Sequence, residues 1–300
     1  MAGYYFVVNP VAGAGKCSEL FTQTMSVLDS RGVAYSYGYT GGTDDAVHMA
    51  HDAALDGYDA VVAVGGDGTA QDVARGVYGT GAPMMVFPFG TGNDFARALR
   101  IPTGCDECVE VLLSGFSRNV DIGRANGNLF LNVSGFGFDT DVLKNTEEYK
   151  KRYTGMKPYL LGIVKTMLHL NRMQLTVEAD DRVLECESLL IAVANGTHFG
   201  GGMNVSPASD PFDGYFDVCL IRSISFPLFI SLLPQFVKGK HIGKKPVEYF
   251  KTKRLAVSSS VEYELNLDGE LKSVTPALFE IEESAIPMII PAQAWESEGA

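Results

Sequence analysis

The stretch VVAVGGDGTAQDVARG, residues 61–76, decides the fold of the N-terminal part of the chain. It joins a short apolar run to a glycine-rich loop, GGDGT at 65–69, and a helical pattern follows at once. A buried strand, a loop and a helix in this order are typical of phosphate-binding units, because the N-terminus of a helix attracts anions. Asp67 lies at the centre of the loop and would repel a phosphate, so a cation between the two is expected.

Three further units of the same kind occur in the first 100 residues, each an apolar run followed by a helical pattern. The expected strands of the four units are YYFVV (4–8), VAYSYGYT (33–40), DAVVAV (59–64) and PMMVFPF (83–89). This alternation predicts a parallel sheet flanked by helices, whose ligands bind beyond the carboxyl ends of the strands. Three of those ends carry unusual loops, which are NPVAGAGK (9–16), GGDGT and GTGND (90–94).

After about residue 125 the pattern changes to alternating strands with two helical interruptions. We expect a hairpin around ADDR in 175–196, further strands in 214–223, 247–259 and 261–270, and helices in 157–170 and 226–237. The predicted fold class is therefore α/β plus all-β, an N-terminal parallel-sheet domain followed by a C-terminal antiparallel β-sandwich. The expected boundaries are 1–125 and 126–285, with 286–300 returning to the first domain.

Composition and length limit the classes of protein to which the chain can belong. The chain has 300 residues, 46% of them hydrophobic and 20% charged, which is ordinary for a globular protein of one or two domains. The start of the sequence does not resemble a signal peptide. The longest apolar segment, 225–237, contains two prolines and is shorter than the ~20 residues of a membrane-spanning helix. The five cysteines do not indicate a disulfide framework, and we expect a cytoplasmic protein.

The distribution of charge is more informative than the net charge of −12. Segments 144–165 and 238–254 hold 13 of the 24 Lys and Arg residues but only three of the 36 Asp and Glu residues. Such segments can form a surface that meets anions, although solvated lysines beside helices and turns are an equal alternative. Nucleic acid is not an expected partner, because the sequence lacks a DNA-binding motif and an aromatic-interleaved basic platform.

Five motifs, in their order and spacing, resemble one family over nearly the whole chain. They are NPVAGAGK, GGDGTAQDV, FPFGTGNDFAR, DPFDGYFDV and LNLDGE. The sequence is similar to bacterial lipid kinases of the diacylglycerol kinase catalytic-domain family, which includes sphingosine and ceramide kinases. The first domain of that family is similar to NAD kinases and phosphofructokinases. The chain departs from the family pattern at Ala12, where serine is more common, and in DPFDG, where two adjacent carboxylates are more common.

The resemblance implies ATP and Mg²⁺ as cofactors. The implied nucleotide-binding residues are Asn9, Pro10, Val11, Ala12, Gly13, Thr40, Gly65, Gly66, Asp67, Gly68, Thr69, Thr91 and Asn93. The glycines of GGDGT permit positive φ and close approach of the backbone to a ligand. Asp67 and Asp94 are expected to hold the metal. For Asp67 the alternative is a helix cap, and Asn93 or Asp94 could cap the helix that follows GTGND. On the metal interpretation, replacing Asp67 by alanine should abolish phosphoryl transfer and leave the thermal melt nearly unchanged.

The motif LNLDGE is expected to supply the catalytic base, because transfer to an alcohol needs a carboxylate that accepts the hydroxyl proton. The resemblance favours Glu270 as proton acceptor, with Asp268 beside the metal or the hydroxyl. On an extended chain these two side chains would point to the same side, whereas a hairpin turn at Asp-Gly is the structural alternative. DPFDGYFDV resembles the family's second, structural Mg²⁺ site, with ligands from Asp210, Asp213 and Tyr215; an acidic turn without metal is the alternative.

The sequence thus predicts an ATP-dependent kinase that phosphorylates a lipid hydroxyl, most simply diacylglycerol to phosphatidate. Other lipid alcohols such as a sphingoid base or phosphatidylglycerol, an NAD kinase, and a non-catalytic nucleotide-binding protein are the alternatives. The expected partner is a lipid at the inner face of the membrane, where the two basic segments would dock on anionic lipid. The sequence leaves open whether the chain forms a homodimer.

Overall fold

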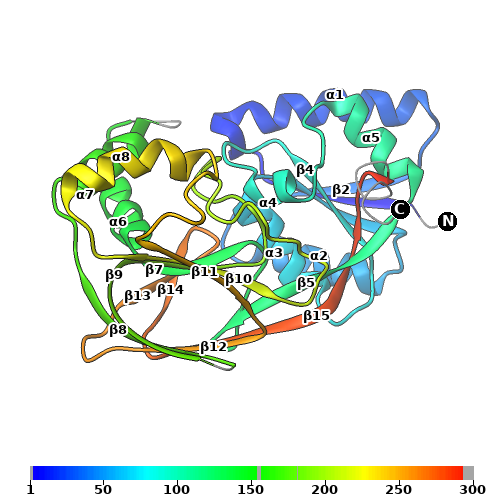
Figure 1. The fold of residues 1–300 in the computed structure, drawn as a ribbon. Helices are drawn as coiled ribbons and strands as arrows, with labels where there is room; N and C mark the ends of the chain where they lie inside the picture. Colours follow the sequence, from blue (N-terminus) through cyan, green and yellow to red (C-terminus); the bar gives the residue numbers. More distant parts are fainter. Residues whose placement is uncertain (1–2, 154–156, 181, 293–300) are drawn as a thin grey trace. The chain divides into compact units, whose positions relative to one another are not determined.

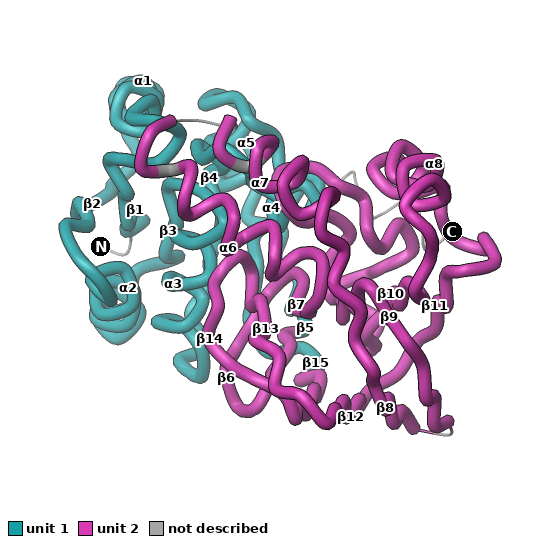
Figure 2. The backbone as a smooth tube through the Cα atoms, turned by 90° about the vertical axis from the view of Figure 1, so that its left-hand side faces the viewer, with its two compact units in different colours: residues 1–121, 283–300 teal, residues 122–282 magenta. Residues whose placement is uncertain are grey.

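The computed structural model describes residues 3–153, 157–180 and 182–292. The chain forms two compact units, shown in separate colours in Figure 2. Unit 1 contains the chain up to Asp121 and the C-terminal segment from Glu283, and unit 2 contains Ile122–Glu282. Every helix in the described residues is too short or too polar to span a membrane. All five cysteines are free thiols, as expected.

The sheet of unit 1 is parallel, which confirms the fold class predicted for this half. Its strands pair in the order β15-β4-β3-β1-β2. The strands are β1 (Tyr4–Val8), β2 (Tyr35–Tyr39), β3 (Ala60–Gly65), β4 (Met84–Pro88) and the end of β15 (Ala277–Ile289). β3 is buried along its whole length, as expected of a central strand that is apolar on both faces. The segment IPMII does return to this sheet, where Met288 pairs with Met84.

Helices cover both faces of this sheet, with α1 and α5 on one face and α2 and α3 on the other (Figure 1). They are α1 (Lys16–Ser30), α2 (Asp45–Leu55), α3 (Asp67–Val77), the short α4 (Asp94–Ala98) and α5 (Cys105–Ser114). Each of α1 to α4 follows a strand, so the N-termini of α1, α3 and α4 lie with their loops at the carboxyl edge of the sheet. Before α1 the chain makes a short turn, η1 (Ala12–Gly15), in which Gly13 and Ala14 have left-handed backbone angles.

Unit 2 is built on antiparallel strands, again as predicted. The long strand β9 is at its centre, because it pairs with β7, β8 and β10. The strands are the end of β5 (Ser117–Ala125), β6 (Asn128–Phe130), β7 (Val133–Gly137), β8 (Met173–Ala179), β9 (Arg182–Ala194), β10 (Phe216–Arg222), β11 (Val247–Thr252), β12 (Arg254–Ser258), β13 (Glu264–Leu267), β14 (Glu270–Val274) and the start of β15. The single strand expected in 247–259 is two strands, β11 and β12, which pair with different neighbours.

The helices of unit 2 are α6 (Phe138–Lys150), α7 (Lys157–Met167) and α8 (Phe226–Val237). The sequence predicted α7 and α8 but not α6, so the expectation of two helical interruptions was wrong. α6 has a mostly polar sequence, FDTDVLKNTEEYK, with too few apolar residues for a clear helical period. It is stabilised by tertiary packing instead, because it packs along α7 and contacts β7, β9 and β13.

Candidate active site

The three glycine-bearing loops of unit 1 touch one another at the carboxyl edge of its sheet. A Cβ atom on Gly90 would lie 2.3 Å from the Cα of Gly66, and a Cβ on Gly13 would lie 2.4 Å from the carbonyl oxygen of Phe89. Each distance is shorter than any side-chain carbon tolerates. The glycines therefore let three backbone segments pack in direct contact, and the loops form one continuous surface.

The glycines of GGDGT do not use the positive φ that glycine permits. Gly66 has φ −105° and ψ −165°, and neither Gly65 nor Gly68 has a positive φ. What these positions require is space: a Cβ on Gly65 would lie 2.4 Å from the Thr69 hydroxyl oxygen. Gly68 differs, since nothing lies within 4 Å of its missing Cβ. It is exposed in the first turn of α3, where a ligand can approach the backbone.

Asn9 connects the first loop to GGDGT. Its amide nitrogen donates to the hydroxyl of Thr69 over 3.2 Å, and its carbonyl oxygen accepts a hydrogen bond from the N–H of Val11. Thr69 is buried in the first turn of α3. Both residues were predicted to bind nucleotide. The structure brings them together and gives their side chains a role in fixing the loops.

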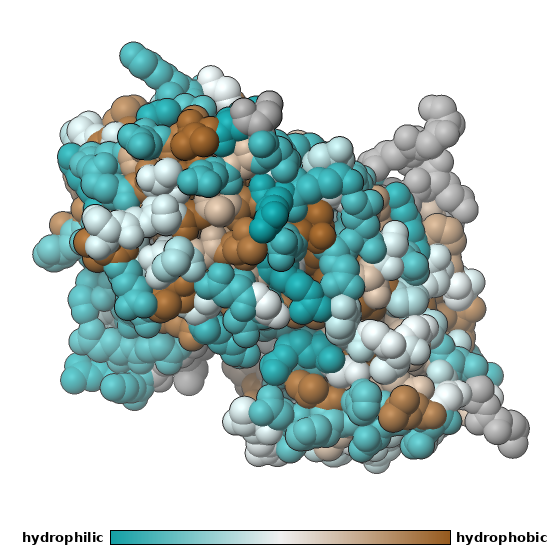
Figure 3. Space-filling model, turned by 90° about the horizontal axis from the view of Figure 1, so that it is seen from below, coloured by the Kyte–Doolittle hydropathy of each residue, from teal (hydrophilic) through white to brown (hydrophobic). Residues whose placement is uncertain are grey.

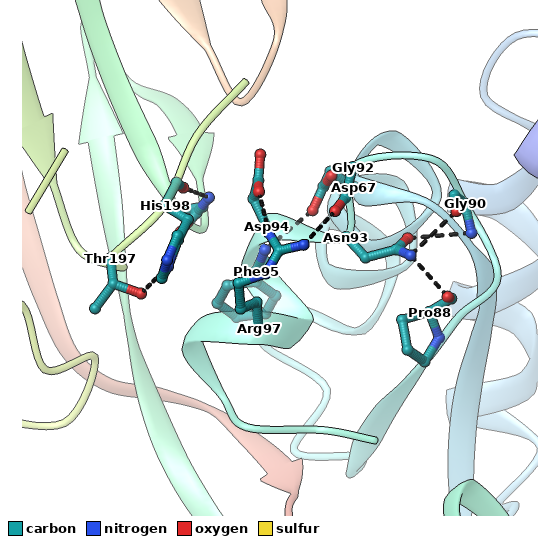
Figure 4. A network of polar contacts seen from close by, with 11 residues as sticks. Asp67, Pro88, Gly90, Gly92, Asn93, Asp94, Phe95, Arg97, Thr197 and His198 are labelled. Carbon is teal, nitrogen blue, oxygen red and sulfur yellow. Dashed lines mark hydrogen bonds and ion pairs between the residues drawn. The ribbon is translucent and has the colours of Figure 1, made fainter. Parts of the chain in front are cut away.

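Asp67 caps a helix, but not the helix that it begins. Its Oδ1 accepts a hydrogen bond of 3.0 Å from the N–H of Phe95, in the first turn of α4 (Figure 4). Burial and the nearby Asp94 carboxylate raise the pKa of Asp67, against the opposing effect of the N–H groups of Phe95, Asp94 and Asn93. Capping and metal binding were weighed as alternatives in the sequence. The structure shows the cap, and the side chain keeps partial exposure for a second role.

Asp94 is the second carboxylate of this site. It is 4% exposed, and its Oδ1 lies 2.5 Å from a guanidinium nitrogen of Arg97 (Figure 4). Two neighbouring carboxylates, of which Asp94 raises the pKa of Asp67, are a donor set that fits Mg²⁺, which favours one or two carboxylates with phosphate oxygens and water. The described residues include no group of three or more His, Cys, Asp or Glu side chains suited to a metal. The pair Asp67 and Asp94 would thus share the ion with a nucleotide.

Asn93 does not cap α4, contrary to one of the two roles expected for it. It has left-handed backbone angles, and its side chain makes no capping bond to the helix. The amide nitrogen donates to the carbonyls of Pro88 and Gly90, and the amide oxygen accepts from the N–H of Gly90 (Figure 4). The side chain therefore shapes the GTGND loop.

The remaining predicted residues of unit 1 lie around the same loops. Thr40 follows β2 and donates its N–H to the carbonyl of Val8 at the end of β1. Val11 is 76% exposed, which is unusual for valine. Thr91 is also exposed, in the GTGND loop. These positions at the strand ends are compatible with nucleotide contact. Pro10 and Ala12 complete the first loop.

We expected Asp268 and Glu270 on an extended chain. Instead, Asp268 lies in the turn of the β13–β14 hairpin and Glu270 is the first residue of β14. Leu267 pairs with Glu270, and the two intervening residues both have positive φ, +49° at Asp268 and +99° at Gly269. This is the geometry of a type I′ turn, for which Asp-Gly is a favoured sequence. The prediction that both carboxylates point to the same side was therefore based on the wrong local structure.

The Asp268 carboxylate binds the chain between β6 and β7. It accepts hydrogen bonds from the N–H groups of Leu131 (2.6 Å), Asn132 (3.0 Å) and Val133 (3.0 Å). Such a set of donors fixes the hairpin turn against its neighbouring strand. Glu270 differs, because its carboxylate is exposed and forms an ion pair with Lys272, two residues further along β14. Of the two, Glu270 is the carboxylate that a substrate can reach.

Asp139 is a site residue that sequence reasoning missed. It is 6% exposed at the start of α6, and its Oδ2 accepts a hydrogen bond of 3.0 Å from Asn266. Asn266 in turn accepts from the N–H of Gly269, in the turn next to Glu270. Burial raises the pKa of Asp139 to about 6. The only available signal was an acidic residue in the otherwise apolar run GFGFD, and that residue lies 127 positions from its partner.

Asp139 also lines an apolar cavity inside unit 2. The cavity is narrow, with a volume of about 30 Å³. α8 forms one wall. Apolar side chains from several elements form most of the rest, among them Val142, Leu190, Phe199, Met203, Leu232 and Phe236. Asp139 Oδ1 is buried and has no hydrogen-bond partner among the described residues.

The acidic turn of unit 2 contains the residues predicted for a second metal. Asp210 Oδ1 accepts from the N–H of Phe212, and Asp213 Oδ1 accepts from the N–H of Tyr215. The other oxygen of Asp213 pairs with Lys251, whose ammonium is also 3.6 Å from the buried Asp217. The backbone carbonyl of Asp210, one of the expected ligands, accepts the N–H of Asp213. The arrangement is an acidic turn whose charge is partly neutralised by a lysine, and the second metal site stays a prediction.

Comparisons with known proteins cover both units. The model of the diacylglycerol kinase catalytic domain matches residues 3–125, and that of the YegS C-terminal NAD kinase beta sandwich-like domain matches residues 132–290. A diacylglycerol kinase of Bacillus subtilis is 30% identical over 297 residues, covering 97% of each chain. One of Staphylococcus epidermidis is 27% identical over 294 residues, covering 97% of this chain and 93% of the other.

Solved structures agree on the fold. A Bacillus anthracis protein aligns with a TM-score of 0.81 at 24% identity, over 97% of this chain and 98% of that one. A diacylglycerol kinase from the same organism aligns with a TM-score of 0.74 at 22% identity, over 97% of both chains. These likenesses support the architecture of an α/β domain joined to an antiparallel β-sandwich. By its two matched domains and its full-length relatives, the chain belongs to the diacylglycerol kinase family and is a kinase.

Proposed function

We propose that this kinase transfers the γ-phosphate of ATP to a hydroxyl of a membrane lipid, and that the lipid is diacylglycerol. The observation that carries the lipid substrate is the narrow apolar cavity of unit 2 with a single carboxylate, Asp139, in its wall. Its apolar lining suits an acyl chain. The relatives named diacylglycerol kinase support the choice of acceptor.

The nucleotide would bind at the three loops of unit 1. The exposed first turn of α3 presents unpaired N–H groups to a phosphate, since the first N–H groups of any helix have no partner within it. Asp67 and Asp94 would hold Mg²⁺ against the phosphates. When bound, the ion neutralises charge on the phosphates and orients them. Arg97 balances part of the acidic charge through Asp94.

The proton of the lipid hydroxyl would go to Glu270. A carboxylate in this role must be ionised and accessible, and Glu270 satisfies the second condition. Lys272 forms an ion pair with Glu270. Asp268 contributes through the turn geometry instead, because its three backbone hydrogen bonds hold the hairpin that carries Glu270.

An acceptor panel tests the proposal. The full chain is incubated with radiolabelled ATP and Mg²⁺ and with diacylglycerol, phosphatidylglycerol, a sphingoid base or NAD, the lipids being supplied in detergent micelles. We expect label in phosphatidate, and its loss in the Glu270→Gln variant. Transfer to another lipid alone would overturn diacylglycerol as acceptor but keep the lipid kinase. Transfer to NAD alone, or ATP binding without any transfer, would overturn the lipid kinase itself.

A further inference from the structure

Helix α8 is apolar on both of its faces. Its sequence, FPLFISLLPQFV, contains no charged residue. Phe229, Leu232 and Phe236 are buried and line the cavity. The opposite side chains are in solvent, with exposures of 46% at Phe226, 43% at Leu228, 39% at Ile230 and 42% at Val237. A surface helix normally has a polar outer face, so a helix without one is expected in a core or against a membrane.

Helix α7 presents a second apolar stripe. Leu160 and Val164 are 59% and 56% exposed, and their spacing of four residues places them on one face of the helix; Leu168, directly after the end of α7, is 67% exposed. α7 and α8 lie at the same upper end of unit 2 in both Figure 1 and Figure 2. The view from below is different, because there the hydrophobic residues stand in small groups between hydrophilic ones (Figure 3).

The chain that continues from α8 is basic. From Ser223 to Val247 there is no acidic residue, and Lys238, Lys240, Lys244 and Lys245 follow the helix directly. All four lysines are exposed, and none of them forms an ion pair with another described residue. Unpaired lysines beside exposed apolar side chains are the combination that attracts a protein to anionic lipid headgroups and anchors it among them.

We propose that α7, α8 and the four lysines form a membrane-docking face that binds bilayers containing anionic lipid. Exposed residues of the two helices would enter the boundary between headgroups and acyl chains, with the lysines at the level of the phosphates. The use of such a face to the protein rests on the proposed function. α8 separates the apolar cavity from this face, so docking would bring the cavity wall to the lipid. Binding to a bilayer can nevertheless be measured without catalysis.

A second copy of the chain is the competing occupant. Most two-chain contacts of identical proteins are two-fold symmetric and apply the same patch of both copies to each other. Such a contact would bring the lysines of one copy towards those of the other, and the described part of the patch from Ser223 to Val247 offers no acid to compensate them. The positive charge of the four lysines therefore favours an anionic lipid surface over a second copy of the chain.

The test is co-sedimentation of the full chain with vesicles of phosphatidylcholine, with or without phosphatidylglycerol. One variant, Leu228→Ser with Ile230→Ser, removes exposed side chains that do not line the cavity. Another replaces the four lysines by glutamine. The matched control is Val183→Ser in β9, because Val183 is equally apolar and 66% exposed. Phosphorylation of a short-chain, water-soluble diacylglycerol reports on the active site separately.

We expect binding to the anionic vesicles, at least ~10-fold weaker binding in either variant, and wild-type binding in the control. Turnover of the soluble substrate should be unchanged in all of them, so a failure of docking is distinguishable from a failure of the kinase. Equal binding to both kinds of vesicle, or wild-type binding by both variants, would overturn the proposal. So would a stable dimer in sedimentation equilibrium that the Leu228→Ser/Ile230→Ser variant dissociates.

Discussion

The observed role of Asp67 and the role proposed for it can be separated by different substitutions. Its carboxylate accepts the N–H of Phe95 and so fixes α4, and in the proposed function it also holds the metal. The expectation from sequence, that alanine would leave the melt nearly unchanged, does not follow from the structure. A capping side chain contributes on the order of 0.5–2 kcal/mol to stability.

We predict that Asp67→Asn and Asp67→Ala both lose at least ~100-fold in kcat, because neither supplies a negative charge to the metal. Asparagine can still accept the N–H of Phe95, so only the alanine variant should lose about 1 kcal/mol of unfolding free energy. Denaturant titration and a radiolabelled ATP assay measure the two effects. Full activity in either variant would contradict the metal role.

Glu270 offers a cleaner separation of activity from stability, because it is exposed. We predict that Glu270→Gln lowers kcat by about 100-fold or more, the usual contribution of a general base, and changes stability by less than about 0.5 kcal/mol. Glu264→Gln is the matched control, since Glu264 is another exposed carboxylate of the same hairpin that pairs with a lysine. A Glu270→Gln variant with wild-type turnover would remove Glu270 from the mechanism.

Asp139 makes stability depend on pH in a direction that can be worked out. Burial raises its pKa from 3.8 to about 6, so the folded state holds the proton more tightly than the unfolded state. Its contribution to stability is therefore full below about pH 4 and is lost as pH rises through about 6, with a total on the order of 3 kcal/mol.

We predict that Asp139→Asn, which cannot ionise, gains stability relative to wild type as pH rises from 4 to 7. Urea unfolding of both proteins across this range gives the difference, in which the other titrating groups cancel. A difference independent of pH would show that Asp139 does not titrate in this range.

At the scale of elements, the contact between the loops after β3 and β4 depends on glycine at one position and not at another. Gly90→Ala would place a Cβ 2.3 Å from the Gly66 Cα, whereas Gly68→Ala meets nothing within 4 Å in a helical turn. We predict a loss of about 1–3 kcal/mol for Gly90→Ala, from overpacking, and no loss for Gly68→Ala, since alanine is the better helix former.

Thermal unfolding of the two glycine variants checks this, and nucleotide affinity adds a second readout. If the backbone of Gly68 approaches a phosphate, Gly68→Ala should weaken ATP binding in spite of its normal stability. A Gly90→Ala variant as stable as wild type would show that the loops can move apart at little cost.

The helices show which elements a sequence can reveal. α3 and α8 were predicted because a clear apolar period or an apolar run marks them, whereas α6 was missed. α6 owes its helical state to packing against α7 and three strands, and that information is not local. The Asp-Gly turn at LNLDGE was only the alternative in the sequence, and the extended geometry expected there was wrong, because strand pairing of Leu267 with Glu270 closes a hairpin.

At the scale of the whole molecule, the proposal assigns different ligands to the two units. We predict that ATP with Mg²⁺ slows amide hydrogen exchange in the loops 9–16, 65–69 and 89–95 of unit 1. A short-chain diacylglycerol should slow exchange in α6 and α8 of unit 2, because both border the cavity. Mass spectrometry of peptides after exchange reads out both. Protection of the unit 1 loops by diacylglycerol alone would contradict this division.

The sequence by itself determined the alternation of strands, loops and helices in unit 1, the change to antiparallel strands in unit 2, and the motifs of the family. These follow from local patterns of apolar residues and turn-forming residues. The tertiary structure decided which polar atoms meet. Asp67 finds its helix 28 residues away, Asp139 its asparagine 127 away and Asp268 its most distant N–H donor 137 away. Whether a carboxylate acts as a cap, an anchor or a base depends on its burial and on hydrogen-bond donors that are distant in the sequence. Only folding brings such donors to the carboxylate.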